Sequence, residues 1–140
     1  MSSAVKFQPF IEDVFEGVHV FRTHQLVAFM TTNANVPLNT YRTLSQVTPI
    51  AYTNYSSRNI TTSSSAQTSG TYKLICTDLV LTLSGGAGAT FRHYGIYNDT
   101  PTSPADPLVL MWDHGSDITP ASGETVTFDF DGTNGVLSAS

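Results

Sequence analysis

Near the start of the chain, apolar residues recur at the spacing of one helix face. They follow positions i, i+3, i+4, i+7 and i+8, which is typical of a helix with a single apolar stripe. Pro9 suits the first turn of such a helix, and Gly17 can adopt the left-handed conformation that often ends one. We predict a helix over about residues 7–16, whose stripe packs on a sheet or, alternatively, docks on a partner subunit. The stripe consists of Phe7, Phe10, Ile11, Val14 and Phe15.

From residue 70 onward, apolar and polar residues alternate with the period of two that strands require. The clearest run predicts that Val126, Phe128 and Phe130 face the core, while the polar residues between them face solvent. Clusters of Gly, Pro and Asn separate the successive runs, as turns do. The predicted strands are 71–83, 90–98, 108–113, 124–130 and 136–139.

The region between the helix and this β-rich part is less regular. Residues 18–32 are typical of one or two strands around a polar break at 22–25, and residues 44–50 indicate a short helical turn. Residues 54–69 are rich in Ser, Thr and Asn, and form either an exposed edge strand or a long loop. A loop of that length is uncommon in a compact domain unless it has a function.

These elements predict one domain over residues 1–140, with no internal repeat and no linker. Strands that recur at short intervals with Gly, Pro and Asn turns are typical of sandwiches and barrels. A chain of 140 residues buries roughly two thirds of its unfolded surface, so it needs no disulfide or metal to fold. We predict an all-β fold, a jelly-roll-like antiparallel β-sandwich with one short N-terminal helix.

Charge along the chain is sparse and acidic. The sequence carries 6 Lys+Arg against 11 Asp+Glu, a net charge of −5, and charged residues make up only 12% of it. The cations are scattered, so we expect no nucleic-acid binding, which needs clustered Lys and Arg. Thr (20) and Ser (15) together make up a quarter of the chain. Such hydroxyls suit close packing against neighbouring proteins, but Thr is also a good strand residue, and both interpretations stay open.

The sequence predicts no membrane association. No run approaches the ~20 apolar residues of a membrane span, and the first residues lack the pattern of a signal peptide. We therefore expect a protein made in a cytoplasm. Its single cysteine, Cys76, lies in an apolar run and is interpreted as a buried hydrophobe rather than a nucleophile.

No arrangement of reactive residues predicts an enzyme or a cofactor. The histidines form no metal-binding motif, and a site joining His93 to Asp113 and His114 would need side chains from opposite faces of a strand. Residues 129–132 resemble the start of a calcium loop, but Ser140 stands where a bidentate Glu is needed. We expect no catalytic, cofactor-binding or metal-binding residue.

Most of the chain resembles small virion proteins of tailed bacteriophages. The resemblance rests on the short helix ending at Gly17 and on four segments of the β-rich part. These segments are SGTYKL (69–74), FRHYGIYNDT (91–100), LMWDHG (110–115) and GETVTFDFDGTNGV (123–136). In size and style the chain is most similar to capsid decoration, or cementing, proteins.

The resemblance implies a structural protein that binds the outside of an HK97-type capsid and stabilises contacts between major capsid protein subunits. It also implies a homo-oligomer, with a dimer favoured, on the virion exterior after synthesis in the host bacterial cytoplasm. A tail or head–tail joining protein is one alternative. Another is a carbohydrate-binding β-sandwich for host attachment, with a sugar platform formed from Tyr41, Tyr52, Tyr55 and Trp112. Alternation, however, places Trp112 in the core.

The segments that regular β-structure explains least are the candidates for protein contacts. They are the N-terminal arm, residues 1–6, and residues 54–69, within which 59–65 could add as a strand to a neighbour's sheet edge. The candidate interface residues are Val5, Lys6, Asn59, Ile60, Thr61, Thr62 and Ser63.

Overall fold

The computed structural model describes residues 4–140 as strands, one α-helix and two short 3₁₀ helices. In chain order the elements are β1 (Val5–Lys6), α1 (Gln8–Phe15), β2 (Leu26–Thr31), η1 (Asn33–Asn35), η2 (Leu44–Gln46), β3 (Asn59–Ile60), β4 (Thr62–Thr68), β5 (Thr71–Cys76), β6 (Leu79–Thr82), β7 (Phe91–Asn98), β8 (Leu108–Ile118), β9 (Thr125–Phe128) and β10 (Leu137–Ala139).

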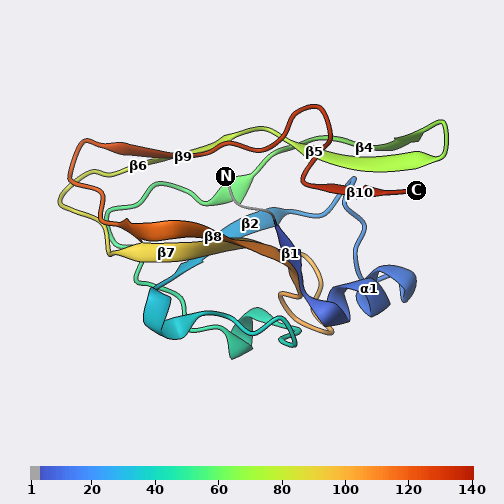
Figure 1. Ribbon diagram of the computed structural model, residues 1–140, viewed down its shortest axis with the longest axis horizontal. Coiled ribbons are helices and arrows are strands. Elements are labelled where there is room, and N and C mark those ends of the chain that lie inside the picture. Colours follow the sequence, from blue (N-terminus) through green and yellow to red (C-terminus); the bar gives the residue numbers. More distant parts are fainter. Residues whose placement is uncertain (1–3) are drawn as a thin grey trace.

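The strands form two facing layers (Figure 1). One layer is a five-stranded sheet in the order β1-β8-β7-β2-β3, and the other contains the ladders β10-β5-β4 and β6-β9. Every ladder between these strands is antiparallel. The predicted all-β sandwich with one short helix is therefore confirmed.

Aromatic side chains fill the space between the two layers. The Tyr94 ring on β7 stacks on Phe128 of β9 with centroids 4.5 Å apart, and Trp112 of β8 stacks on the same tyrosine at 5.3 Å. Phe130 lies 6.0 Å from Trp112 and is also buried. The predicted inward face of residues 124–130 is confirmed for Phe128 and Phe130, whereas Val126 is half-buried.

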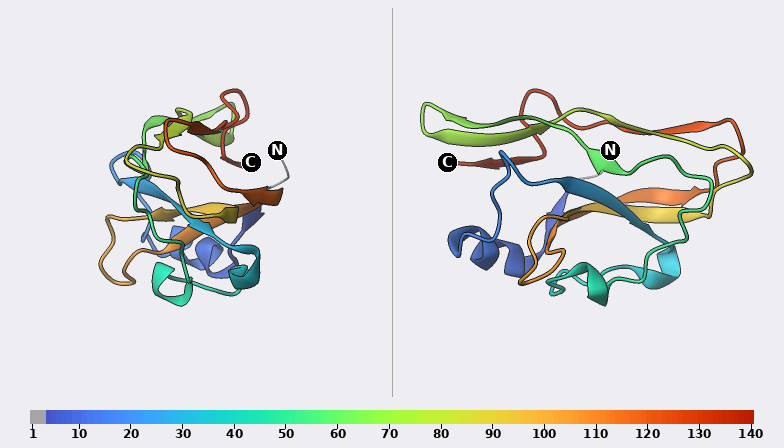
Figure 2. Two further views of the ribbon diagram at one scale, coloured as in Figure 1. Left: turned by 90° about the vertical axis from the view of Figure 1, so that its left-hand side faces the viewer. Right: turned by 180° about the vertical axis from the view of Figure 1, so that it is seen from behind.

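The other face of the five-stranded sheet is covered by α1 and by the segment that carries η1 and η2 (Figure 2). Phe7, just before α1, is fully buried with its ring 6.4 Å from that of Phe29 on β2. Gly95 on β7 makes this close packing possible, because a Cβ atom there would lie 2.5 Å from the Phe29 ring and from the Leu110 carbonyl oxygen. Both faces of β2 and of the first half of β8 are thus buried, which explains the almost continuous apolar sequences LVAFMT and LVLMW.

Helix α1 begins and ends within one residue of the predicted bounds. It ends in a Schellman motif: Gly17 N donates to the Val14 carbonyl at 3.2 Å, and Val18 N donates to the Asp13 carbonyl at 2.9 Å. Gly17 has a φ of +77°, as its predicted role requires.

The prediction that the whole apolar stripe of α1 packs on the sheet is wrong in part. Phe7 and Phe10 are buried, but Phe15 is 85% exposed and Ile11 is 48% exposed. The buried side of the helix runs through Asp13 instead, which is fully buried in an ion pair with Arg42. This ion pair turns the Ile11–Phe15 side of the helix toward solvent.

One predicted strand is wrong, and the structure decides between the alternatives predicted for two other segments. The strand predicted at 71–83 is split into β5 and β6, because the chain changes ladders at Asp78, whose Oδ1 accepts a hydrogen bond from Phe130 N at 2.9 Å. Of the one or two strands predicted within residues 18–32, β2 is the one that forms, and residues 21–24 turn, with the Val20 carbonyl accepting from Thr23 N and His24 N. Residues 54–69 contain β3 and β4, so the edge-strand alternative for this segment is correct.

We predict that truncating the aromatic core is costly while truncating its polar neighbour is not. Phe128→Ala removes a ring stacked on Tyr94 and leaves a cavity, so it should lower the free energy of unfolding by about 3–5 kcal/mol. Thr127→Ala, on the opposite face of β9, should change it by less than about 1 kcal/mol. Chemical denaturation of both variants measures the difference, and equal losses would contradict the register of β9.

Candidate protein-interaction surfaces

Strand β4 forms an open edge of the β10-β5-β4 ladder. It joins β5 through a two-residue turn in which Ser69 and Gly70 both have positive φ, +52° and +83°. Because Thr68 pairs with Thr71 across this turn, it is a type I′ turn, which matches the natural twist of a hairpin. The sequence of β4, TSSSAQT, contains no charged residue and no proline, the features that commonly protect strand edges.

The register shows which backbone groups of β4 point away from the sheet. The carbonyl of Leu74 on β5 points toward β10 and accepts a hydrogen bond from Val136 N at 2.8 Å. Leu74 is paired with Ser65, so in an antiparallel ladder the N–H and carbonyl of Ser65 point outward. Arg22 Nη2 reaches the Ser65 carbonyl at 3.4 Å from that side. By the same alternation, the backbone of Gln67 also faces outward.

The structure places the predicted interface residues on opposite edges of the five-stranded sheet and on β4. Val5 and Lys6 form β1, which pairs with β8 at one edge, and Asn59 forms part of β3 at the other. Residues 1–3 of the predicted arm lie outside the described residues. The remaining predicted residues, Thr61, Thr62 and Ser63, lead from β3 into β4, and a bulge falls between Thr62 and Ser64.

Ile60 differs from the other predicted interface residues because its side chain belongs to the core. It is 3% exposed and pairs with Leu26 on β2. Its carbonyl accepts from Gln25 Nε2 at 2.9 Å. A contact at Ile60 would therefore involve backbone rather than side chain.

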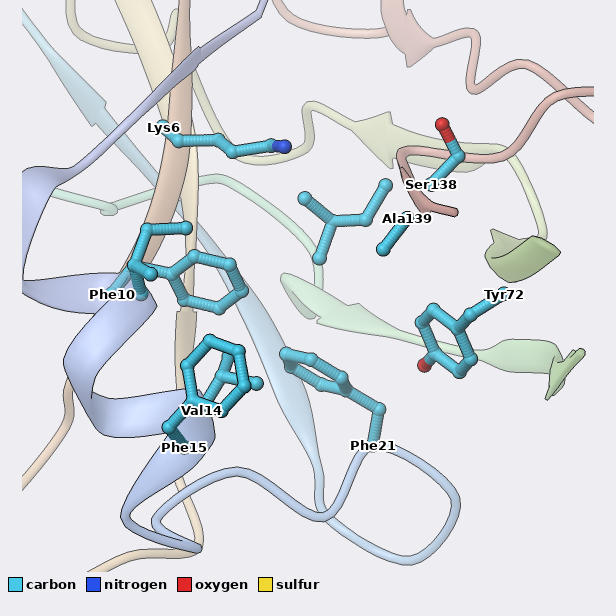
Figure 3. Close-up of a pocket in the computed structure, with 10 residues that line it drawn as sticks. Lys6, Phe10, Val14, Phe15, Phe21, Tyr72, Ser138 and Ala139 are labelled. Carbon is cyan, nitrogen blue, oxygen red and sulfur yellow. The ribbon is translucent and has the colours of Figure 1, made fainter. Parts of the chain in front are cut away.

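An apolar groove that the sequence did not reveal lies between α1 and the β10-β5-β4 ladder (Figure 3). Its volume is about 170 Å³. Helix α1 forms one wall, Tyr72 and Ala139 line the opposite side, Phe21 closes one end and the Lys6 side chain extends along the other. These residues come from four distant segments of the chain, so no local pattern could have grouped them.

A buried polar network holds the turn beside this groove. Asn98 Nδ2 lies 3.1 Å from His19 Nδ1 and 2.9 Å from His24 Nδ1, so both histidines accept from one amide. The His19 ring packs between Phe10 and Phe21, with ring centroids 5.1 Å from each. Burial lowers the pKa of His19 to about 4, which keeps the imidazole neutral at neutral pH.

The arrangement closest to a catalytic one is a row of Thr31, His93 and Asp113 across β2, β7 and β8. His93 Nδ1 lies 3.9 Å from Asp113 Oδ1, and Arg92 binds the same carboxylate at 3.0 and 3.3 Å, holding its pKa near 2. The Thr31 hydroxyl, however, is fully buried, so a substrate could not reach it. Within residues 4–140, no three His, Cys, Asp or Glu side chains are grouped as metal ligands.

The aromatic residues considered for a sugar platform are engaged in the fold. Trp112 is buried, as its alternation predicts. The Arg58 guanidinium covers the face of Tyr52 at 3.6 Å, and the Tyr55 hydroxyl donates to the Ala89 carbonyl at 2.7 Å. Cys76 is also buried, and burial raises the pKa of its thiol to about 11.

We predict that the buried imidazole of His19 makes stability depend on pH. Its pKa is about 4 in the folded chain against 6.5 when exposed, so between these values the unfolded state binds more protons. The free energy of unfolding should therefore fall by roughly 2–3 kcal/mol between pH 6.5 and pH 4 because of this group. His19→Gln should flatten that part of the profile, whereas His114→Gln, at an exposed position, should not. Identical pH profiles for wild type and His19→Gln would contradict the assignment.

The fold and these surfaces were compared with known proteins. No protein-family model matches the chain, and no curated protein or solved structure is similar to it. Among residues 4–140, no helix is long and apolar enough to cross a membrane.

Proposed function

We propose that this chain is a structural virion protein that binds the outside of an HK97-type bacteriophage capsid and stabilises contacts between major capsid protein subunits. The observation that carries the proposal is the edge of β4, which pairs with no further strand and has no charged residue of its own, although Arg22 reaches the Ser65 carbonyl from that side. The resemblance to phage virion proteins, based on the short helix ending at Gly17 and on residues 69–74, 91–100, 110–115 and 123–136, indicates which protein would be the partner. On this proposal the chain has no catalytic role.

The edge of β4 has the properties that strand addition requires. The outward-facing N–H groups of Ser65 and Gln67 and the carbonyl of Gln67 can pair with a strand of the major capsid protein, because main-chain bonds supply affinity without a specific sequence. The Ser65 carbonyl would have to exchange its contact with Arg22. Small side chains on β4 let the partner backbone approach closely. The type I′ turn fixes the hairpin before binding, which lowers the entropy lost on association.

The sparse charge of this surface sets the expected salt dependence. The outer face of the β4–β5 hairpin is lined by Ser64, Ala66, Thr68, Thr71, Lys73 and Ile75, with one cation among six residues. Binding through such a face depends on backbone and hydroxyl hydrogen bonds rather than on long-range charge attraction. Affinity for the shell should therefore change little with ionic strength.

We predict that removing one outward-facing donor on β4 weakens binding to the shell. Ser65→Pro deletes an N–H that points away from β5, so the β4–β5 ladder keeps its own bonds. Ser65→Ala removes the hydroxyl that contacts the Tyr72 hydroxyl but keeps the N–H, and serves as the matched control. Occupancy on undecorated shells, measured by co-sedimentation at low and high salt, should fall for Ser65→Pro and stay near wild type for Ser65→Ala.

Folded Ser65→Pro that decorates shells at wild-type occupancy would remove β4 from the contact.

The proposed role itself is tested on purified particles of the phage that encodes the chain. Quantitative mass spectrometry should find on the order of hundreds of copies per particle, as a repeating shell requires. A dozen copies or fewer would favour a tail or head–tail joining protein instead. Binding to host polysaccharide in a pulldown, with none to shells, would favour the carbohydrate-binding alternative.

A further inference from the structure

The exposed side of α1 and the neighbouring groove form a knob and a hole on one surface. The knob is Phe15, which is 85% exposed in the last turn of the helix. The hole is the apolar groove beside the same helix, lined by Phe10, Phe21 and Tyr72 and also by Phe15 itself (Figure 3). Ile11 and Val14 on the same helix face are 48% and 39% exposed, so Phe15 is part of a contiguous exposed apolar patch, which in a soluble protein often marks an interaction site.

The hole has the size and chemistry of an aromatic ring. Its volume is about 170 Å³, and its lining is almost wholly apolar. Apolar cavities of about 150 Å³ accept a benzene ring. A phenylalanine side chain is therefore of a size that this open groove can accept beside its own Phe15.

Charges at the two ends of α1 indicate which surface supplies that ring. Lys6 lies just before the N-terminus of the helix, and Glu16 caps its C-terminus. Each charge stands at the unfavourable end of its own helix dipole, because the N-terminus is positive and the C-terminus negative. The first turn contains no acidic residue and the last turn no basic residue to offset them. A partner helix running antiparallel would place Glu16 beside Lys6 and reverse both mismatches.

We propose that two copies of this chain associate about a two-fold axis that crosses α1, with Phe15 of each copy inserted into the groove of the other. A two-fold interface is self-complementary, so one surface must carry both the knob and the hole, and both ends of each charge pair. Antiparallel α1 helices satisfy this condition: Phe15 reaches the partner groove while Glu16 meets Lys6 twice. Ile11 and Val14, both partly exposed, lie between them at the axis. This inference goes beyond the proposed function and does not depend on it.

The first test uses sedimentation equilibrium of the full chain over a range of concentrations. Wild type should show a concentration-dependent monomer–dimer equilibrium, and Phe15→Ala should raise its dissociation constant at least about tenfold. Val80→Ala, an exposed apolar residue on β6, is the matched control and should leave the equilibrium unchanged. A monomeric wild type, or a Phe15→Ala variant that dimerises like wild type, overturns the proposal. Capsid binding that is lost in Phe15→Ala while wild type stays monomeric would make the capsid protein the occupant and likewise overturn it.

The second test exploits the symmetry of the interface. Lys6→Glu and Glu16→Lys should each weaken dimerisation, because each variant alone places like charges opposite one another twice. An equimolar mixture of the two variants should form a heterodimer of near wild-type affinity, since both contacts then join opposite charges. Failure of the mixture to recover dimerisation overturns the antiparallel arrangement. Circular dichroism of each variant verifies that the exposed substitutions leave the fold intact.

Discussion

The ion pair between Asp13 and Arg42 determines how the outer layer of this protein is assembled. Asp13 is fully buried on α1, so its carboxylate needs a cation, and Arg42 supplies one from the segment before η2. Arg42 is itself held by its backbone: its N–H donates to Gln46 Oε1, and its carbonyl accepts from Leu108 N on β8. Helix, 3₁₀ turn and sheet are thus joined at one point. Removing Arg42 would leave the fully buried Asp13 carboxylate uncompensated, which is costly, whereas the Arg42 side chain is 41% exposed and can be solvated without its partner.

Because this pair fixes the rotation of α1, it also fixes which residues the helix exposes. A prediction made from an amphipathic stripe assumes that the apolar residues of the helix face the core. Here the buried arc of the helix is shared between Phe10 and Asp13, so Phe15 is displaced to the outside. The apolar stripe can be recognised in the sequence, but the direction in which it faces cannot, because the partner of Asp13 lies 29 residues further along the chain. The groove beside the helix follows from the same rotation.

Local patterns predicted those elements whose determinants are local. Gly17 ends α1 through its own backbone conformation, and the alternation around Phe128 identified the inward face of β9. The break between β5 and β6 was missed because it depends on a hydrogen bond from Phe130 N to Asp78, 52 residues away. Residues 54–69 were predicted as an edge strand or a long loop because they are rich in Ser, Thr and Asn, and the structure places β4 at a ladder edge. Only pairing in three dimensions distinguishes their outward-facing backbone groups from those bonded to β5.

The burial of Cys76 has a practical consequence for chemistry on this protein. With its thiol pKa near 11, only about one molecule in ten thousand carries the reactive thiolate at neutral pH, and packing closes the approach to the sulfur. Maleimides and alkylating reagents should therefore react very slowly with the native cysteine. A second cysteine placed on an exposed strand would react alone, so fluorophores, spin labels or crosslinkers can be attached at one chosen position without first replacing a residue of the core.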